Sequence, residues 1–135
     1  EEMYGALNFS FIYSRIKFIF INTNSREYNF NGHVPDLDWL RHELKPEDEF
    51  DNAIVVFHVP PFDIDFDRNL ENDFQSVLSM YGNVLLAVHG HIHSLDTITP
   101  YYNGIPYINV YGVRQRKFHL IHITENEFDH ETVDY

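Results

Sequence analysis

Three histidines that follow two short apolar runs form the pattern in this sequence that is best suited to chemistry. His58 comes directly after the apolar run 53–57. His91 and His93 follow the run 84–88 as Gly-His-Ile-His, and their spacing sends the two rings in diverging directions. Neutral imidazole binds divalent zinc, iron and manganese, and ligands held at strand ends lose little entropy on binding. The pattern predicts His58, His91 and His93 as metal ligands and indicates no separate catalytic residue or organic cofactor site.

A strand, a helix and a second strand are expected to position these histidines. Residues 53–57 have the apolar character of a buried strand, residues 70–81 carry apolar side chains at helical spacing, and residues 84–88 form another short apolar run. Elements in this order favour a parallel strand pair with a right-handed crossover. His58 and His91 would then lie at the same carboxyl edge of the sheet, where ligands of open α/β sheets bind.

The remaining elements are predicted from the same kinds of pattern. Residues 6–13 alternate as a strand with one buried face, and residues 16–22 are apolar enough for a central strand covered on both faces. The two runs are expected to pair as a hairpin around Ser14 and Arg15. Further elements are a helix from Pro35 to Pro46, strands at 96–99, 106–110, 118–124 and 128–133, and a hairpin turn at Asn103-Gly104. The predicted fold class is α/β with mixed sheets.

The composition limits the classes of function. The chain has 135 residues, which predicts a single domain over 1–135, and its net charge of −12 argues against a surface for nucleic acids or anionic membranes. It has no cysteine, so imidazole and carboxylate are the available metal ligands. The densest apolar run, 18–21, is too short to span a bilayer, and nothing in the sequence indicates a cellular compartment.

Taken in order, several segments resemble the carboxyl-terminal half of the catalytic domain of calcineurin-like metallophosphoesterases. They cover most of the chain: Phe18-Ile19-Phe20-Ile21-Asn22-Thr23-Asn24, Asp38-Trp39-Leu40, Ile54-Val55-Val56-Phe57-His58-Val59-Pro60-Pro61, Gly90-His91-Ile92-His93-Ser94 and Asn103-Gly104-Ile105-Pro106-Tyr107-Ile108. The resemblance implies half of a four-layer α/β/β/α sandwich. It also implies two divalent ions, manganese, iron or zinc, with His58 and His91 on one ion and His93 on the other.

The function implied by this resemblance is hydrolysis of phosphate esters by a hydroxide that a dinuclear metal centre activates. The family's Asp-x-His, Gly-Asp and Gly-Asn-His motifs, which supply the bridging aspartate and further ligands, do not occur in this sequence. We therefore expect residues 1–135 to lack the amino-terminal metal-binding half, to bind metal weakly or not at all, and to be inactive alone. The missing half should also leave apolar surface bare along 18–21 and 53–57, and self-association would cover it.

Two other classes of protein remain as alternatives. A non-catalytic interaction domain would keep the fold, although the presence of all three expected histidines disfavours loss of the site. A mononuclear His-x-His enzyme of the cupin kind should have a glutamate soon after the second histidine on an all-β scaffold, and residues 94–97 contain none.

His89 and three aspartates lie close to these motifs in the sequence and are not predicted as metal ligands. His89 precedes the glycine of the motif and is expected to support the site rather than bind metal. Asp63, Asp65 and Asp67 alternate after Pro61, but the glycine and terminal glutamate of a calcium-binding EF-hand loop are missing. They are expected to form an acidic loop over the mouth of the site that touches substrate.

Overall fold

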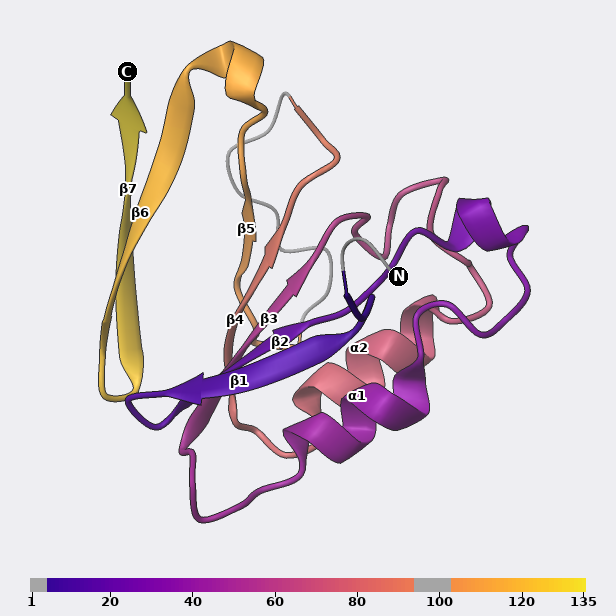
Figure 1. The fold of residues 1–135 in the computed structure, drawn as a ribbon, viewed down its shortest axis with the longest axis horizontal. Helices are drawn as coiled ribbons and strands as arrows, with labels where there is room; N and C mark the ends of the chain where they lie inside the picture. Colours follow the sequence, from indigo (N-terminus) through magenta and orange to yellow (C-terminus); the bar gives the residue numbers. More distant parts are fainter. Residues whose placement is uncertain (1–4, 94–102) are drawn as a thin grey trace.

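The computed structural model describes residues 5–93 and 103–135, which adopt a mixed α/β fold. Its main sheet has five strands in the order β1-β2-β3-β4-β5 (Figure 1). The strands are β1 (Phe9–Tyr13), β2 (Ile16–Phe20), β3 (Asn52–Phe57), β4 (Val84–His89) and β5 (Tyr107–Asn109). β1 and β2 are antiparallel, whereas β2 to β5 are all parallel. The expected α/β class with mixed strand directions is confirmed.

The β1–β2 hairpin turns at the two residues that the sequence indicated. Ser14 and Arg15 both have positive φ angles, 48° and 64°, as the two central residues of a type I′ turn require. The guanidinium of Arg15 donates to both carboxylate oxygens of Asp51, at 2.6 and 2.7 Å. This bidentate pair ties the turn to the segment that leads into β3.

Two amphipathic helices cover one face of the sheet (Figure 1). Helix α1 (Leu37–Leu44) begins after Asp36, whose side chain accepts a hydrogen bond from the backbone N–H of Trp39 at 3.0 Å. Helix α2 (Glu71–Ser79) ends shortly before Gly82, which has a positive φ of 67°. Both predicted helices are confirmed. Their apolar stripes pack on the side chains of the sheet that face them, in a core that includes Ile19, Ile21, Leu40, Leu44, Val55, Phe57, Phe74 and Leu78.

A second sheet covers the other face. It is the antiparallel hairpin of β6 (Lys117–Thr124) and β7 (Glu127–Asp134), which turns at Glu125 and Asn126 as expected. Ile121, Ile123 and Phe128 of this hairpin pack against a cluster centred on Ile54, Leu86 and Ile108. The layers are therefore helices, main sheet and hairpin, and no α-helix within 5–93 or 103–135 covers the outer side of the hairpin.

An ion pair in the interior joins β2 to α1. Lys17 is 7% exposed, and its Nζ lies 3.0 Å from Oε2 of Glu43, which also accepts a hydrogen bond from the Ser10 hydroxyl. Burial by itself would raise the pKa of Glu43, but the hydrogen bonds from Ser10 and Lys17, with the charge of Lys17, lower it overall. The ionised carboxylate is therefore the form that the folded chain favours.

Two expectations about exposure are wrong. The face of residues 6–13 is not buried, because β1 is the edge strand: Phe9 and Phe11 are 47% and 49% exposed and stack on Phe20 and Phe18. Residues 53–57 are not bare either, since helices cover one side of β3 and the β6–β7 hairpin lies over the other. Of residues 18–21, only Phe18 and Phe20 are partly exposed.

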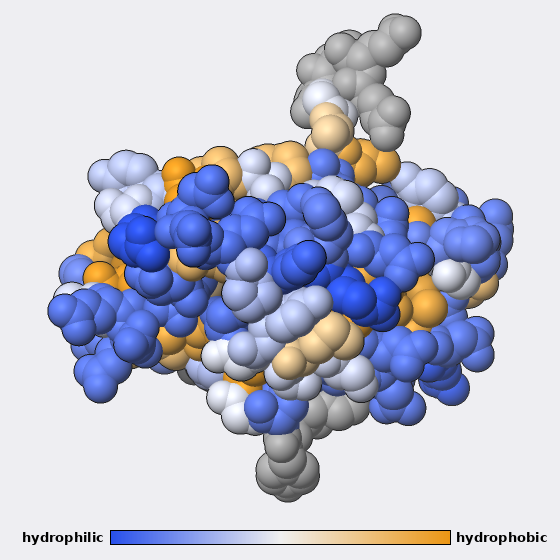
Figure 2. Space-filling model, turned by 90° about the horizontal axis from the view of Figure 1, so that it is seen from below, coloured by the Kyte–Doolittle hydropathy of each residue, from blue (hydrophilic) through white to orange (hydrophobic). Residues whose placement is uncertain are grey.

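Figure 2 shows one face on which hydrophilic residues dominate and apolar residues appear in smaller patches between them. No helix of the described residues has the length and apolar character needed to span a bilayer. The strand expected at 96–99, and with it the other arm of a hairpin at Asn103-Gly104, lies outside the described residues.

Candidate metal centre

Parallel pairing of β3 and β4 brings the first two predicted ligands to one edge of the sheet. Phe57 is in register with His89, so His58 and the turn after His89 emerge side by side at the carboxyl ends of the strands. The backbone N–H of Gly90 continues the ladder and donates to the carbonyl of His58 at 3.2 Å. The predicted parallel pair, and the common edge for His58 and His91, are confirmed.

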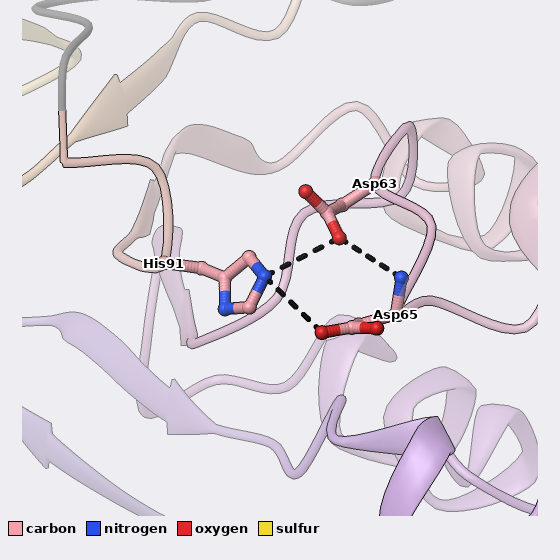
Figure 3. A group of neighbouring side chains, drawn as sticks. All are labelled: Asp63, Asp65 and His91. Atoms are coloured by element: carbon pink, nitrogen blue, oxygen red, sulfur yellow. Dashed lines mark hydrogen bonds and ion pairs between the residues drawn. The ribbon is translucent and has the colours of Figure 1, made fainter.

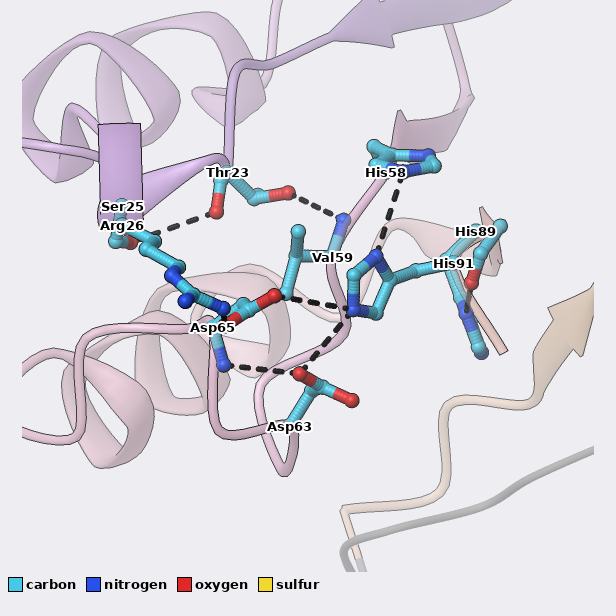
Figure 4. Close-up of polar contacts among 10 residues, drawn as sticks. Thr23, Ser25, Arg26, His58, Val59, Asp63, Asp65, His89 and His91 are labelled. Atoms are coloured by element: carbon cyan, nitrogen blue, oxygen red, sulfur yellow. Dashed lines mark hydrogen bonds and ion pairs between the residues drawn. The ribbon is translucent and has the colours of Figure 1, made fainter. Parts of the chain in front are cut away.

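The rings of His58 and His91 approach each other through their nitrogens, as Figure 4 shows. Nε2 of His58 lies 3.4 Å from Nδ1 of His91, and the ring planes are nearly perpendicular, at 89°. Two nitrogens bound to one zinc ion at about 2.0–2.1 Å and at the tetrahedral angle lie about 3.3–3.4 Å apart. The spacing of this pair therefore fits two ligands of a single ion.

An unusual turn aims His91 at its partner. Its φ is 71°, and the N–H of Ile92 donates to the carbonyl of Gly90 at 2.9 Å, the hydrogen bond of a γ-turn centred on His91. A positive φ is uncommon for a residue with a side chain, and such conformations are enriched at functional sites. The residue before it must be small, because a Cβ on Gly90 would lie 3.2 Å from Nδ1 of His58.

The other ring nitrogen of His91 faces two carboxylates. Its Nε2 lies 3.3 Å from Oδ1 of Asp63 and 3.6 Å from Oδ2 of Asp65 (Figure 3). Within the described ranges, these three residues are the group whose possible ligand atoms all lie within 4.8 Å of one another. Sequence reasoning placed the acidic loop at the mouth of the site but missed its contact with His91. The Asp-x-Asp spacing directly after His58-Val-Pro-Pro was the available signal.

Neighbouring segments hold this loop in place. The 3₁₀ turn η1 (Ser25–Tyr28) supplies Arg26, whose guanidinium donates to Oδ1 of Asp65 at 2.9 Å. The hydroxyl oxygen of Thr23 accepts from the backbone N–H of Val59 at 2.9 Å (Figure 4). Asp67 belongs to the packing and not to the site, because it is buried and accepts from the N–H of Gly32 at 3.1 Å.

A cleft of about 300 Å³ opens beside the histidine pair. Its walls come from the loop after β2, the start of the acidic loop and the two histidines: Asn24, Arg26, Glu27, His58, Val59, Asp65 and His91. Arg26 is the cation among these residues. Arg26 is paired with Asp65, and Glu27 adds a second carboxylate to the lining, so the lining and size favour a small polar group.

His93 is near the pair but is not joined to it. Its carbonyl accepts from Nε2 of Gln115 at 2.8 Å, and its ring lies beside Gly112, whose added Cβ would be 3.7 Å from Cδ2. Like His58, His93 belongs to no group of three possible ligand atoms within 4.8 Å among residues 5–93 and 103–135. Its role as ligand to a second ion stays a prediction.

The surroundings of His58 lower the pKa of its ring. Partial burial lowers the pKa of His58, the nearby imidazoles of His91 and His93 lower it further, and the carboxylate of Glu27 opposes them. The lowered pKa favours the neutral ring, which has a lone pair available. A neutral imidazole is the form that a metal ion requires.

His89 supports the site from the interior. It is 1% exposed, stacks on Phe57 at a centroid distance of 5.8 Å, and its Nδ1 donates to the carbonyl of Gly90 at 3.0 Å. Burial lowers the pKa of His89, and the nearby histidines add to this against the opposing Gly90 hydrogen bond. The residue packs beneath the Gly-His-Ile-His turn, where a structural role was expected for it.

A comparison with protein-family models and with curated proteins finds no match to this chain.

Proposed function

We propose that this chain supplies the histidine ligands of a metal-dependent phosphoesterase. The observation that carries the proposal is the 3.4 Å approach of His58 Nε2 to His91 Nδ1 at the carboxyl edge of the parallel strands, a spacing that one divalent ion fits. The ordered resemblance to calcineurin-like metallophosphoesterases adds the substrate class, a phosphate ester. It also adds a second ion, for which His93 is the proposed ligand.

Each group has a defined part in this proposal. His58 and His91 hold an ion, and manganese, iron and zinc all accept imidazole ligands. When bound, such ions polarise phosphoryl oxygens and make water a better nucleophile. Arg26, which lines the adjoining cleft, is paired with Asp65 and would have to leave that carboxylate to contact a phosphate group. Since the chain is acidic overall, the positive charge that attracts a phosphate would come from the bound ion.

The ligand set of this chain suits one ion better than two. A bridging carboxylate is what brings two cations within about 3.5–4 Å of each other, and the motifs that supply it in the resembling family are missing here. We therefore propose that residues 1–135 hold a single ion weakly and do not hydrolyse esters alone, and that activity needs the Asp-x-His, Gly-Asp and Gly-Asn-His ligands.

Calorimetric titration with zinc and manganese tests the metal site. We expect at most one ion to bind, with a dissociation constant above micromolar, and the binding to be lost in His58→Ala and His91→Ala. The matched control is His122→Ala on β6, which removes an exposed imidazole next to Glu131 and should leave binding unchanged. Equal binding by all three variants would overturn the site. Sub-micromolar binding of two ions would overturn the proposed need for further ligands.

Hydrolysis of p-nitrophenyl phosphate tests the reaction. The source gene should encode the three missing motifs upstream of these residues. The protein that carries those motifs should hydrolyse the ester, and replacement of His58, His91 or His93 should reduce the rate. A reading frame without those motifs would contradict the phosphoesterase proposal.

The second candidate is a non-catalytic interaction domain, and one observation favours it. Phe9 and Phe11 on the edge strand stack on Phe20 and Phe18, and the rings of the edge strand are about half exposed. Exposed aromatic ladders of this kind are typical of surfaces that bind another protein. Self-association that persists in His58→Ala and is lost when Phe9 and Phe11 are both replaced by serine would support this candidate.

A further inference from the structure

We infer that Asp63 is a positioning residue, whose carboxylate accepts a hydrogen bond from Nε2–H of His91 and leaves Nδ1 of that ring free to bind metal beside His58. This inference rests on the proposed function, because it assigns the residue that prepares the metal ligand. It does not make Asp63 a ligand or a catalytic residue.

The geometry of the His91 ring supports this assignment. Nε2 lies 3.3 Å from Oδ1 of Asp63, and Nδ1 lies 3.4 Å from Nε2 of His58 on the opposite side of the ring (Figure 4). An ionised carboxylate only accepts hydrogen bonds, so the proton of a neutral His91 is favoured at Nε2. Its lone pair is then at Nδ1, the atom that faces His58. Histidines that bind metals commonly donate their other ring N–H to a carboxylate in this way.

The backbone holds the Asp63 carboxylate ready for this contact. The N–H of Asp65 donates to the same Oδ1 of Asp63 at 2.9 Å, closing a local turn (Figure 3). The side chain of Asp63 is largely buried, at 19% exposure. Because the backbone N–H of Asp65 already holds this carboxylate, Asp63 loses little further side-chain entropy when it orients His91.

Asp65 has a different part, although it is also close to His91. Its Oδ2 is 3.6 Å from Nε2, beyond hydrogen-bond distance, and its Oδ1 accepts from Arg26 at 2.9 Å. The Arg26–Asp65 pair therefore offsets the second negative charge next to the ring. Asp63 is left as the nearer carboxylate to Nε2 of His91, at 3.3 Å, and as the proposed acceptor.

The ring tautomer of His91 gives a direct test that needs no metal and no activity. In the metal-free chain, labelled with nitrogen-15 in histidine, long-range proton–nitrogen spectra at a pH where the ring is neutral should show His91 with its proton on Nε2. Asp63→Ala should shift this ring to a mixture of tautomers, and Asp63→Asn, which keeps the acceptor oxygen, should restore the Nε2–H form. Asp38→Ala, at an exposed carboxylate on α1, is the matched control and should change nothing. A proton on Nδ1 in the wild-type chain would overturn the inference.

Zinc titration gives the second readout. Asp63→Ala should weaken binding by about 10–100-fold, Asp63→Asn by less, and Asp38→Ala not at all. Unchanged affinity in Asp63→Ala would overturn the inference even if the site binds metal. If His58→Ala and His91→Ala show that no metal site exists, the proposed function fails, while the tautomer spectra still decide whether Asp63 orients His91.

Discussion

Replacement of Gly90 by alanine perturbs the candidate metal centre without removing a ligand. The new Cβ would lie 3.2 Å from Nδ1 and 3.6 Å from Cε1 of His58, and 3.8 Å from Cγ2 of Val110. The first contact is tighter than ordinary van der Waals contact, so the His58 ring must move by about 0.2 Å or more. His58 lies at the exposed edge of the sheet and has room to move.

Two opposing terms set the expected size of the stability change. Gly90 does not have a positive φ, so alanine fits its backbone and should stabilise the chain by about 0.4–1 kcal/mol through the unfolded state. Displacement of His58 offsets this gain, and we expect a net change near zero for Gly90→Ala. In a His58→Ala background the His58 ring is absent, and Gly90→Ala should stabilise the chain by the full amount of about 0.4–1 kcal/mol.

Urea unfolding of four proteins measures this coupling: wild type, Gly90→Ala, His58→Ala and the double variant. The coupling free energy should be about 0.5–1 kcal/mol, above the usual additivity error of about 0.3–0.5 kcal/mol. In zinc titration, Gly90→Ala should bind about 10-fold more weakly than wild type, because the ligand pair is displaced. Equal stabilisation in both backgrounds, together with unchanged zinc affinity, would refute the close contact between Gly90 and His58.

Three further predictions follow from other features of the fold. In urea unfolding, His91→Gly should be more stable than His91→Ala by about 1 kcal/mol, because glycine adopts the positive φ at this position without strain. Equal stabilities of the two variants would contradict the strained turn. Glu43→Gln should destabilise the chain at pH 7 by about 1.5–3 kcal/mol, since it leaves Lys17 without its counter-charge. The folded pKa of Glu43 is lowered, so this difference in stability from wild type is present above pH 4.5 and should shrink as the pH falls through the folded pKa. A stability difference that does not depend on pH would exclude the ion pair as its cause. Light scattering at high concentration should detect self-association of the chain through edge strand β1. This self-association should be lost when Phe9 and Phe11 are both replaced by serine, and a monomeric wild-type chain would contradict the prediction.

Local patterns in the sequence were sufficient for the elements that carry the histidine pair. The apolar runs 53–57 and 84–88 with a helix between them predict a parallel pair, because the handedness of such crossovers leaves essentially one arrangement. That arrangement places His58 and His91 at one edge, as the structure has them. The β1–β2 and β6–β7 hairpins were equally accessible, since short turns join runs of matching period.

Contacts between distant segments were decided only by the tertiary structure. A period-two pattern shows that a strand has two faces but not which partner covers each one, so the exposure of β1 and the cover over β3 were predicted wrongly. The β6–β7 turn reaches β3 across more than 70 residues, where Asn52 donates to the side chain of Asn126 at 2.8 Å. Long-range packing of this kind has no local signal in the sequence.

The same limit applies to the candidate site. Sequence reasoning placed Asp63 and Asp65 near its mouth from their position after His58-Val-Pro-Pro, but the side of the His91 ring that they face depends on how two loops fold over one sheet edge. The positive φ of His91 and the small space beside Gly90 fix that orientation. Residue types therefore specify which chemistry is available, and loop packing specifies which atoms meet, because a difference of about 1 Å separates a ligand from a neighbour.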